Sequence, residues 1–470
     1  ICKDAGTARG APSVDFAENN RSDGSIDMGC YEYTCSSPSG GVASSSSTVC
    51  SGATTSLSVS GYNARAIKWQ ESSDNLSWSD VSTGSNYTTS SFTTAAINST
   101  TYYRVAASCD GSTYSANSNV VTITVNNTIY YVNDNSTSGD TWCTAVGNDA
   151  NSGTSIFSPK ATLASVLALV SCGDIIYVDK GIYTEENLSI ADNTVRLTII
   201  GAGNDKTIFD GDNSDDWLTF ASGGNTSNIT ITDMTVKEYG GTASQSGGGI
   251  IVSGGTGILF QDMIFHSMDT YGSYNDGGVM YVNNASSVEF DRCIFHNNES
   301  GDMASVIYWN SSGTLTMKNC LVYENYAVDD AHIYIYSGTS NITNCTFADN
   351  ASCPEGTVYS RGTTTINNCI FDGNSSSYDI ERAAGTLTMN YCMYDSKNGI
   401  ITDNNAVSGN PTFTDAANDD YTITLGSTGI DAGDNTHVSG WSYDLSENTR
   451  IIYSTVDLGA FEFLGADPVI

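Results

Sequence analysis

A short alternation of apolar and polar positions recurs through the second half of the chain. Each copy has an apolar residue three positions before a pivot residue and another two after it, as in FQDMIF, FDRCIF and INNCIF. The pivots are Met234, Met263, Cys293, Cys320, Cys345, Cys369 and Cys392, and neighbouring pivots lie 29, 30, 27, 25, 24 and 23 residues apart. A period in this range is typical of stacked solenoid repeats.

The pattern inside each copy predicts two short strands that meet at a corner. Positions five and three before the pivot share one face of a strand, and the phase then slips by one residue. Asn residues, which tolerate tight turns, stand five after four of the pivots, at Asn298, Asn325, Asn350 and Asn374. Each copy therefore predicts one coil of parallel strands, and stacking the coils buries the pivots as a core ladder with a rise of about 4.8 Å.

A different pattern occupies residues 34–126. Short strand runs such as SLSVSG, AIKWQES and TYYRVAAS alternate with Ser-rich turns, and Trp69 stands between Cys50 and Cys109. Short strands at this spacing with a Cys–Trp–Cys order predict an immunoglobulin-like (Ig-like) β-sandwich with Trp69 in its core. The segment resembles the Ig-like modules of large bacterial surface proteins, particularly those of the Bacteroidota.

The segment that follows carries a second motif. The run ATLASVLALV from Ala161 has helical spacing and predicts a helix that covers the open edge of the first coil. A pattern GD-x-I-x-V-x-x-G-x-Y-x-E then contains Gly173, Asp174, Ile176, Val178, Gly181, Tyr183 and Glu185. With VDLGAFEF from Val456, this segment resembles secreted right-handed parallel β-helix proteins. The resemblance implies an all-β fold, a right-handed parallel β-helix (pectate-lyase-like solenoid) plus the Ig-like β-sandwich.

One end motif occurs twice. DAG starts at both Asp4 and Asp431, an offset of 431 − 4 = 427 residues, and SIDMGCYEY from Ser25 matches TVDLGAFEF near the other end. We therefore expect the chain to be one period of a tandem array. The expected parts are 1–33, the end of a preceding β-helix; 34–126, the sandwich; 127–190, the β-helix opening strand and capping helix; 191–425, the coils; and 426–470, a closing segment and linker.

The net charge of the chain excludes some classes of binding partner and bears on its location. The chain has 17 Lys and Arg against 52 Asp and Glu, a net charge of −35. Such a field repels nucleic acids and anionic membranes, and no run is long and apolar enough to span a bilayer. We expect no nucleic-acid partner, no membrane insertion, and an extracellular or cell-surface location.

The 13 cysteines divide into two groups. The five ladder cysteines are expected to be small buried side chains without disulfides. Outside the ladder, Cys50 with Cys109 and Cys143 with Cys172 are the candidate disulfides. The pairing of Cys2, Cys30, Cys35 and Cys353 stays open. No CxxC pair occurs and only 4 His are present, which argues against zinc.

The sequence offers three further kinds of candidate site. Asp210, Asp212, Asp215 and Asp216 have the spacing of a calcium-binding turn, although a solvated acidic turn is favoured and no other cofactor is expected. His266 and His296 both follow their pivots by three residues and should stack; a surface ladder is favoured over a metal site. Glycosylation sequons occur, among other places, at Asn86, Asn228, Asn341 and Asn374.

The search for catalytic residues finds no assembled set. Parallel β-helix enzymes mostly act on acidic polysaccharides, with a carboxylate cluster and a base or with paired Asp. Arg292, Arg361 and Arg382 stand at different phases of separate coils. The leading hypothesis is therefore a non-enzymatic extracellular structural or adhesive protein that binds copies of itself head to tail. The alternatives are a polysaccharide lyase or glycoside hydrolase with an accessory binding domain, and an adhesin for surface glycans.

Overall fold

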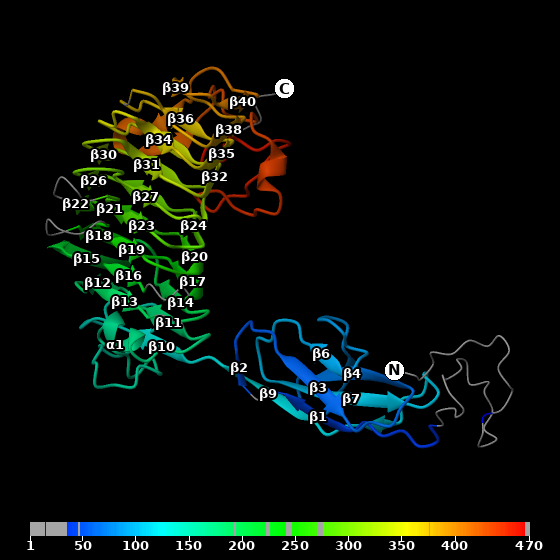
Figure 1. Cartoon of the computed structure of the whole chain (residues 1–470). Helices are drawn as coiled ribbons and strands as arrows, with labels where there is room; N and C mark the ends of the chain where they lie inside the picture. The colour runs from blue at the N-terminus through cyan, green and yellow to red at the C-terminus, as the bar shows by residue number, and fades with distance from the viewer. Residues whose placement is uncertain are drawn as a thin grey trace. The chain divides into compact units, whose positions relative to one another are not determined.

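The computed structural model of the protein describes residues 15, 35–45, 48–191, 194–221, 226–240, 247–270, 276–375 and 377–465. The chain forms two compact units, residues 1–126 and 127–470 (Figure 1). The boundary falls where the sequence pattern changes. Residues 1–33, which would carry the head-to-tail contact, lie outside the described residues apart from Asp15.

The first unit is a two-layer sandwich of mostly antiparallel strands. One sheet contains β1 (Val42–Ser45), β3 (Ser56–Ser60) and β6 (Ser91–Thr93). The other contains, in order, β2 (Thr48–Cys50), β9 (Val121–Asn126), β7 (Thr101–Ser108), β4 (Ala66–Ser72) and β5 (Ser79–Asp80), with β8 (Ala116–Asn117) beside β7. Trp69 is fully buried between the layers, with its ring 5.6 Å from that of Phe92.

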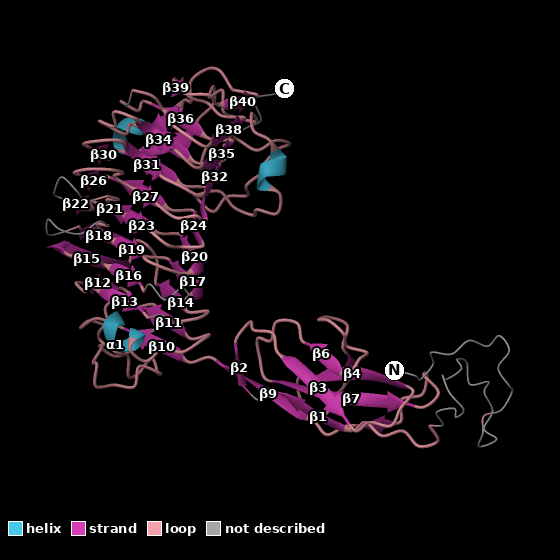
Figure 2. Ribbon diagram, viewed as in Figure 1, coloured by secondary structure: helices cyan, strands magenta, loops and turns pink. Residues whose placement is uncertain are grey.

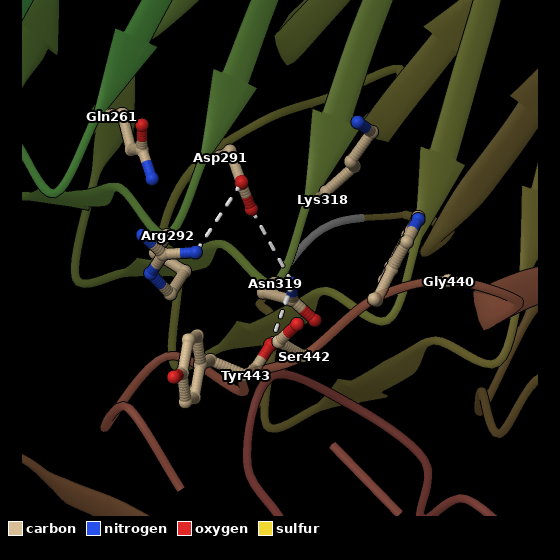
Figure 3. Close-up of a pocket in the computed structure, with 9 residues that line it drawn as sticks. Gln261, Asp291, Arg292, Lys318, Asn319, Gly440, Ser442 and Tyr443 are labelled. Atoms are coloured by element: carbon tan, nitrogen blue, oxygen red, sulfur yellow. Dashed lines mark hydrogen bonds and ion pairs between the residues drawn. The ribbon is translucent and has the colours of Figure 1, made fainter. Parts of the chain in front are cut away.

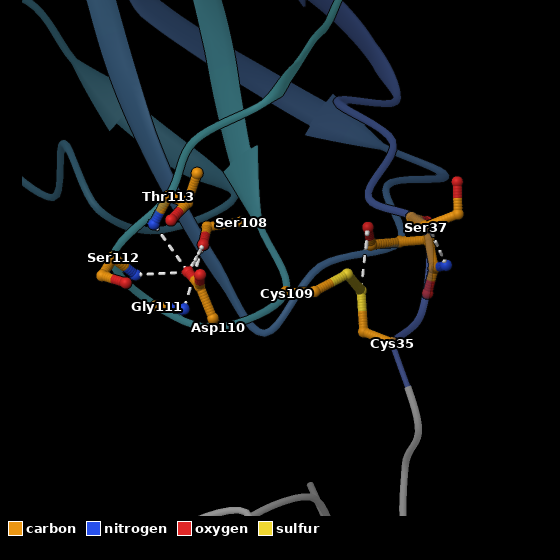
Figure 4. The surroundings of a disulfide bond; sticks show 9 residues. Cys35, Ser37, Ser108, Cys109, Asp110, Gly111, Ser112 and Thr113 are labelled. Carbon is orange, nitrogen blue, oxygen red and sulfur yellow. Dashed lines mark hydrogen bonds between the residues drawn. A yellow bond between two sulfur atoms is a disulfide. The ribbon is translucent and has the colours of Figure 1, made fainter.

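The disulfide of this unit differs from the prediction. Cys109 is bonded to Cys35, so the predicted Cys50–Cys109 bond is wrong (Figure 4). The strand order explains why. Cys50 pairs with Asn126 at one end of β9, and β7 runs antiparallel to β9, which places Cys109 at the opposite end of the sheet. Cys50 is nevertheless disulfide-bonded.

Within the described residues, the second unit is built from three long parallel sheets (Figures 1 and 2). The first sheet contains β10 (Ile129–Val132), β11 (Ile175–Val178), β14 (Thr198–Gly201), β17 (Ser227–Thr232), β20 (Thr256–Gln261), β24 (Ser287–Asp291), β28 (Thr314–Lys318), β32 (Thr339–Thr343), β35 (Thr363–Asn367), β38 (Thr386–Asn390) and β40 (Thr402–Asn404). The second contains β12 (Gly181–Tyr183), β15 (Thr207–Ser214), β18 (Thr235–Tyr239), β21 (Ile264–His266), β25 (Ile294–His296), β29 (Leu321–Tyr323), β33 (Thr346–Ala348) and β36 (Ile370–Asp372).

The third sheet completes each coil. It contains β13 (Leu188–Ile190), β16 (Leu218–Phe220), β19 (Ile250–Val252), β23 (Met280–Val282), β27 (Ile307–Trp309), β31 (Ala331–Ile335), β34 (Gly356–Ser360), β37 (Ile380–Arg382) and β39 (Lys397–Asn398). A short sheet of β22 (Asp269–Thr270), β26 (Glu299–Ser300) and β30 (Tyr326–Ala327) lies between the second and third along the chain. The predicted parallel β-helix is therefore confirmed.

Strands of neighbouring coils pair so that residues at the same position relative to their pivots lie side by side. Phe260, three before its pivot, pairs with Ile231 on one neighbouring strand and with Phe290 on the other. All seven pivots have 0% exposure and lie in one continuous core. The five ladder cysteines are free thiols, and burial raises the pKa of Cys293 and Cys345 far above the ordinary value. The ladder therefore contributes apolar packing.

The asparagines that follow the pivots point inward, whereas the pattern predicted only turns. Asn298 Nδ2 donates to Asn325 Oδ1, Asn325 to Asn350, and Asn350 to Asn374, each at 2.9 Å. Each also donates to a backbone carbonyl of another coil, for example Asn325 to Phe295 at 3.0 Å. This asparagine ladder ties successive coils together through satisfied buried amides.

We expect Asn325→Ala to lower the free energy of unfolding by about 3 kcal/mol, because it leaves two buried donors of Asn298 without an acceptor at about 1–3 kcal/mol each. Urea unfolding would measure it. Asn341→Ala, on the solvent-facing side of the first sheet, is the control and should change stability little. Equal losses in the two variants would contradict a special role for the ladder.

A short helix covers the first coil. Helix α1 (Leu163–Leu167) is shorter than the predicted helical run, and Thr162 caps it. The carboxylate of Glu185 accepts the backbone N–H groups of Leu163 and Ala164 at 2.7 and 2.8 Å. Carboxylates at a helix start satisfy its free N–H groups. The motif glutamate therefore anchors the cap.

The predicted disulfide Cys143–Cys172 is wrong. Cys143 is a free buried thiol against the Asp179 carboxylate, which also accepts the Cys143 backbone N–H at 2.6 Å. Cys172 is disulfide-bonded elsewhere. Asp179 thus organises the loop around Cys143 by hydrogen bonds, where sequence spacing suggested a covalent link.

Residues 413–465 fold back along the β-helix. This closing segment includes β41 (Phe413–Asp415), η1 (Ala416–Asn418), β42 (Asp420–Ile423) and η2 (Asn435–Val438). Arg450 is completely buried, 2.7 Å from Glu462, and it donates to Asn319 Oδ1 at 3.1 Å. Arg450 therefore links the segment internally and fixes it to the coils. Among the described residues, no helix has the length and apolar character of a membrane span.

Candidate active site

The two positions before each pivot bring charged side chains together along one edge of the first β-helix sheet. Gln261, Asp291 and Lys318 end strands β20, β24 and β28 and pair in register, so they form one row. The next residues, Asp262 and Arg292, both have a left-handed φ of 53° at the corner. Since in-register parallel neighbours point the same way, the two rows lie side by side.

A cavity of about 290 Å³ opens over the first row (Figure 3). The coils supply Gln261, Asp291, Arg292, Lys318 and Asn319, and the closing segment supplies Gly440, Trp441, Ser442 and Tyr443. Lys318 Nζ lies 5.5 Å from the centre of the Trp441 ring, and Asn319 Nδ2 donates to the Tyr443 carbonyl at 3.3 Å. The closing segment therefore forms one wall of the cavity.

Arg292 is held at the centre of the site. Its Nε and Nη2 donate to the two carboxylate oxygens of Asp262 at 2.7 and 2.8 Å, and its Nη1 lies 3.4 Å from Asp291 Oδ2. A bidentate pair of this kind fixes the plane of the guanidinium. Asp262 thus orients a cation beside Asp291.

The surroundings of Asp291 shift the pKa of its carboxyl upward. Burial raises the pKa of its carboxyl, and the charges of Arg292 and Lys318 offset this only in part. Asn319 Nδ2 lies 3.4 Å from Asp291 Oδ1, and the amide of Gln261 stands on the adjacent strand. A carboxyl with a raised pKa between amide donors and cations suits proton transfer and stabilisation of a developing oxyanion.

A second cavity of about 320 Å³ lies on the other side of Arg292. Asp233, Asp262 and Glu447 line it, so three carboxylates face one guanidinium. Burial, assisted by the charges of Asp262 and Glu447, raises the pKa of Asp233. An anionic ligand would therefore prefer the first cavity to the second.

The predicted calcium turn is ion-paired instead. Asp210 Oδ2 lies 2.7 Å from Lys237 Nζ, and the Asp212 backbone N–H donates to Asp210. Asp210 and Asp212 lie in strand β15, and Asp215 and Asp216 follow directly after it. Among the described residues, no group of three or more His, Cys, Asp or Glu side chains is placed to hold a metal ion. The geometry therefore gives the calcium prediction no support.

The two predicted histidines stack as a surface ladder. The rings of His266 and His296 lie 4.8 Å apart at 15°, and Tyr323 continues the stack 4.9 Å from His296. Burial lowers the pKa of His266, and it lowers the pKa of His296 to about 4. Neutral packed rings agree with the ladder that the pattern favoured.

The glycosylation candidates occupy different environments. Asn86 is an exposed loop residue and Asn228 an exposed residue of β17, with φ of 63° and 56°, and Asn341 is half-buried in β32. Asn374 is a member of the asparagine ladder, and its Nδ2 donates to Phe347 and Asp379 at 3.1 and 3.2 Å. A glycan would have to bond to this same nitrogen and would replace one of these hydrogen bonds.

Several acidic side chains are partly buried near like charges. Burial, then the charge of Asp215, raises the pKa of Asp216 to about 7, and burial with Glu355 raises that of Asp330 to about 7. Burial raises the pKa of Asp269 to about 6. These carboxyls favour folding when protonated, so their contribution is complete below a pH of about 4 and is lost as pH rises through 6 to 7.

We expect the melting temperature to fall as pH rises from about 5 to about 8. His296 acts in the opposite sense, because the unfolded chain binds a proton near pH 6.5 that the half-buried ring binds only near pH 4, so its contribution to stability is lost as pH falls from about 6.5 to about 4. Calorimetry across this range would show a maximum at mildly acid pH. A melting temperature that rises steadily towards pH 8 would contradict the assignment.

Sequence reasoning missed Gln261, Asp262, Asp291 and Lys318, and it dismissed Arg292. A usable signal was present in the repeat. When the copies are aligned on their pivots, the two preceding positions are charged or amide-bearing in the coils of Asp262, Arg292 and Asn319. The arginines alone do not reveal the site, because Arg361 and Arg382 stand at other positions of their coils. The row of Gln261, Asp291 and Lys318 becomes visible only when the residues just before each pivot are compared between coils.

Parts of the chain match known families. Residues 39–127 match a domain of unknown function (DUF8696), residues 220–411 match the right-handed beta helix region, and residues 150–285 match pectinesterase. No curated protein matches the chain. The family 28 exopolygalacturonase of Yersinia enterocolitica is a similar solved structure, at 11% identity and a TM-score of 0.19, over 80% of this chain and 97% of that one. That likeness is too slight to bear on function.

The pectinesterase match corrects the leading hypothesis from the sequence. It contradicts a non-enzymatic structural or adhesive protein, and it favours the alternative of a carbohydrate-active enzyme on a β-helix. The structural hypothesis rests on the duplicated end motif, the core ladder and the lack of an assembled catalytic set. The row of Gln261, Asp291 and Lys318 beside Arg292 removes the last of these grounds, because carboxyl, amide and cationic groups share one cavity.

Proposed function

We propose that the protein is an extracellular pectin-modifying enzyme that hydrolyses methyl esters of galacturonan in the cavity beside Asp291. One coincidence carries the proposal: the stretch that matches pectinesterase, residues 150–285, contains Gln261, and its row continues through Asp291 and Lys318 into the same cavity. The sandwich, with two sheets around Trp69 that support an Ig-like module, is its accessory domain.

The charges of the cavity suit a partly esterified galacturonan. Free uronate groups are anionic, and Arg292 and Lys318 are the cations that line this cavity. Lys318 forms an ion pair with Glu289, which holds its side chain near Trp441. The rings of Trp441 and Tyr443 offer apolar surfaces to the faces of sugar rings. Substrate would bind along the row, against the closing segment.

The reaction needs one group that transfers a proton and hydrogen-bond donors that stabilise an oxyanion. Asp291 takes a proton from water, and the water oxygen bonds to the ester carbonyl carbon. The amide of Gln261 and the ammonium of Lys318 stabilise the resulting oxyanion. Collapse breaks the bond to the methoxy oxygen, which receives the proton from Asp291 and leaves as methanol. Arg292, oriented by Asp262, keeps the Asp291 carboxyl in place.

Incubation with highly methyl-esterified pectin tests the proposal. Methanol, measured by a coupled alcohol oxidase assay, should accumulate without new reducing ends or unsaturated uronates. Reducing ends without methanol would identify a glycoside hydrolase, and unsaturated ends would identify a lyase. Either result would refute ester hydrolysis.

A further inference from the structure

The sandwich unit has a cavity of its own. It has a volume of about 500 Å³ and is lined by Trp78, Glu71, Thr101 and four serines between Ser72 and Ser79. The lining lies on strands β4, β5 and β7 and on the loop that joins β4 to β5. It combines one aromatic plane, several hydroxyl groups and one carboxylate.

The aromatic plane is held in position. The guanidinium of Arg104 lies 4.2 Å from the centre of a Trp78 ring. Arg104 Nε donates to Gln70 Oε1 at 2.9 Å, and Gln70 Nε2 donates to Asp80 at 2.9 Å. This chain of contacts braces the indole through neighbouring strands. A braced ring loses less conformational entropy when a ligand binds.

The loop beside Trp78 is also ordered. Asp74 Oδ1 accepts the backbone N–H groups of Ser77 at 2.7 Å and Leu76 at 2.8 Å, and the Ser72 hydroxyl at 2.9 Å. These hydrogen bonds, the one from Ser77 foremost, lower the pKa of Asp74 to about 2. The carboxylate therefore stays ionised and fixes the loop, so the cavity wall does not depend on a ligand.

The lining fits an uncharged sugar ring. An indole packs against the C–H face of a pyranose, and hydroxyl and carboxylate groups bind sugar hydroxyls. Glu71 is the charged residue of the lining; Arg104 braces Trp78 but does not line the cavity. A free uronate would place its negative charge near Glu71, whereas a methyl-esterified unit carries none.

We propose that this cavity binds methyl-esterified galacturonate units, and so distinguishes unreacted pectin from the de-esterified product. The inference rests on the proposed ester hydrolysis for its choice of polymer. It gives the sandwich a definite role: the protein stays on esterified stretches and is released as free carboxylates accumulate. The binding itself needs no catalysis, which allows the two proposals to be tested apart.

Binding is measured with the full chain carrying Asp291→Asn, so that the polymer is not altered. Affinity electrophoresis in gels with highly esterified pectin or with polygalacturonate gives the two dissociation constants. We expect pectin to bind at least about tenfold more tightly. Trp78→Ala should weaken pectin binding about tenfold, Trp78→Tyr should retain most of it, and Tyr62→Ala, an exposed aromatic outside the cavity, should leave it unchanged.

Two further variants make the result decisive. Glu71→Gln should strengthen binding of polygalacturonate and reduce the preference for pectin. Ser77→Arg, which fills the cavity without removing the indole, should weaken pectin binding even if Trp78→Ala fails to fold. Equal binding of both polymers, or full pectin binding by Ser77→Arg, would overturn the inference. Methanol release from short esterified oligogalacturonides by the wild-type chain reports separately on the proposed reaction.

Discussion

An Asp291→Asn variant is expected to release methanol from esterified pectin about 10² to 10⁴ times more slowly than the wild-type chain, the usual contribution of a positioned acid–base group. Asn keeps the shape of Asp but accepts no proton from water. The side chain still faces Arg292 and Asn319, so substrate binding should change little. Initial rates over a range of pectin concentrations should show a loss in kcat with KM nearly constant.

The control for this variant is Asp403→Asn. Asp403 lies on β40, the last strand of the same sheet, and its carboxylate pairs with Lys397 away from the cavity. This variant should keep the wild-type rate. Melting curves of both variants would show whether the fold is retained. Equal rates for Asp291→Asn and the wild type would remove Asp291 from the mechanism.

The second large effect concerns the closing segment. Arg450→Met should lower the free energy of unfolding by about 3–5 kcal/mol, because it leaves the buried Glu462 carboxyl, whose pKa burial already raises to about 8, without its cation. It also removes the hydrogen bonds to the Asp457 and Gly459 carbonyls. Urea unfolding measures the stability. Methanol release should fall as well, since the loosened segment carries Trp441.

One variant serves as a control for this prediction, and a second should restore part of the lost stability. Arg382→Met removes a partly exposed arginine that donates to the Gly385 carbonyl, and it should change stability little. Pairing Arg450→Met with Glu462→Leu removes both charges and should restore part of the stability, since a buried ion pair can be replaced by apolar groups. If Arg450→Met were as stable as Arg382→Met, the closing segment would not depend on this ion pair.

The β-helix was predictable because each coil repeats the same physical requirement. An apolar residue three before the pivot, the pivot itself and the residue two after it must all face the core, so Phe260, Met263 and Phe265 mark a coil by spacing alone. The direction of the asparagines was not predictable. Asn325 suits a turn or a buried ladder equally well, and only amide partners one coil away decide between them.

The disulfides and the site depend on topology that spacing does not contain. Cys35 meets Cys109 because the segment before β1 lies beside Asn63, and β4, which follows Asn63, pairs with the end of β7 at Ser108. No local sequence pattern encodes that arrangement. The residues that the coils contribute to the site could be predicted from the positions just before the pivots. The wall formed by Trp441 could not, because it requires residues more than a hundred positions away to return over Asp291.

A time course followed by proton NMR spectroscopy tests the central claim most directly. The wild-type chain is mixed with methyl-esterified polygalacturonan, and the ester methoxyl, free methanol and anomeric signals are followed together. The account predicts that methanol grows as the methoxyl signal declines, with the anomeric signals of chain ends unchanged. A constant methoxyl signal, or new chain ends without methanol, would contradict ester hydrolysis at this site.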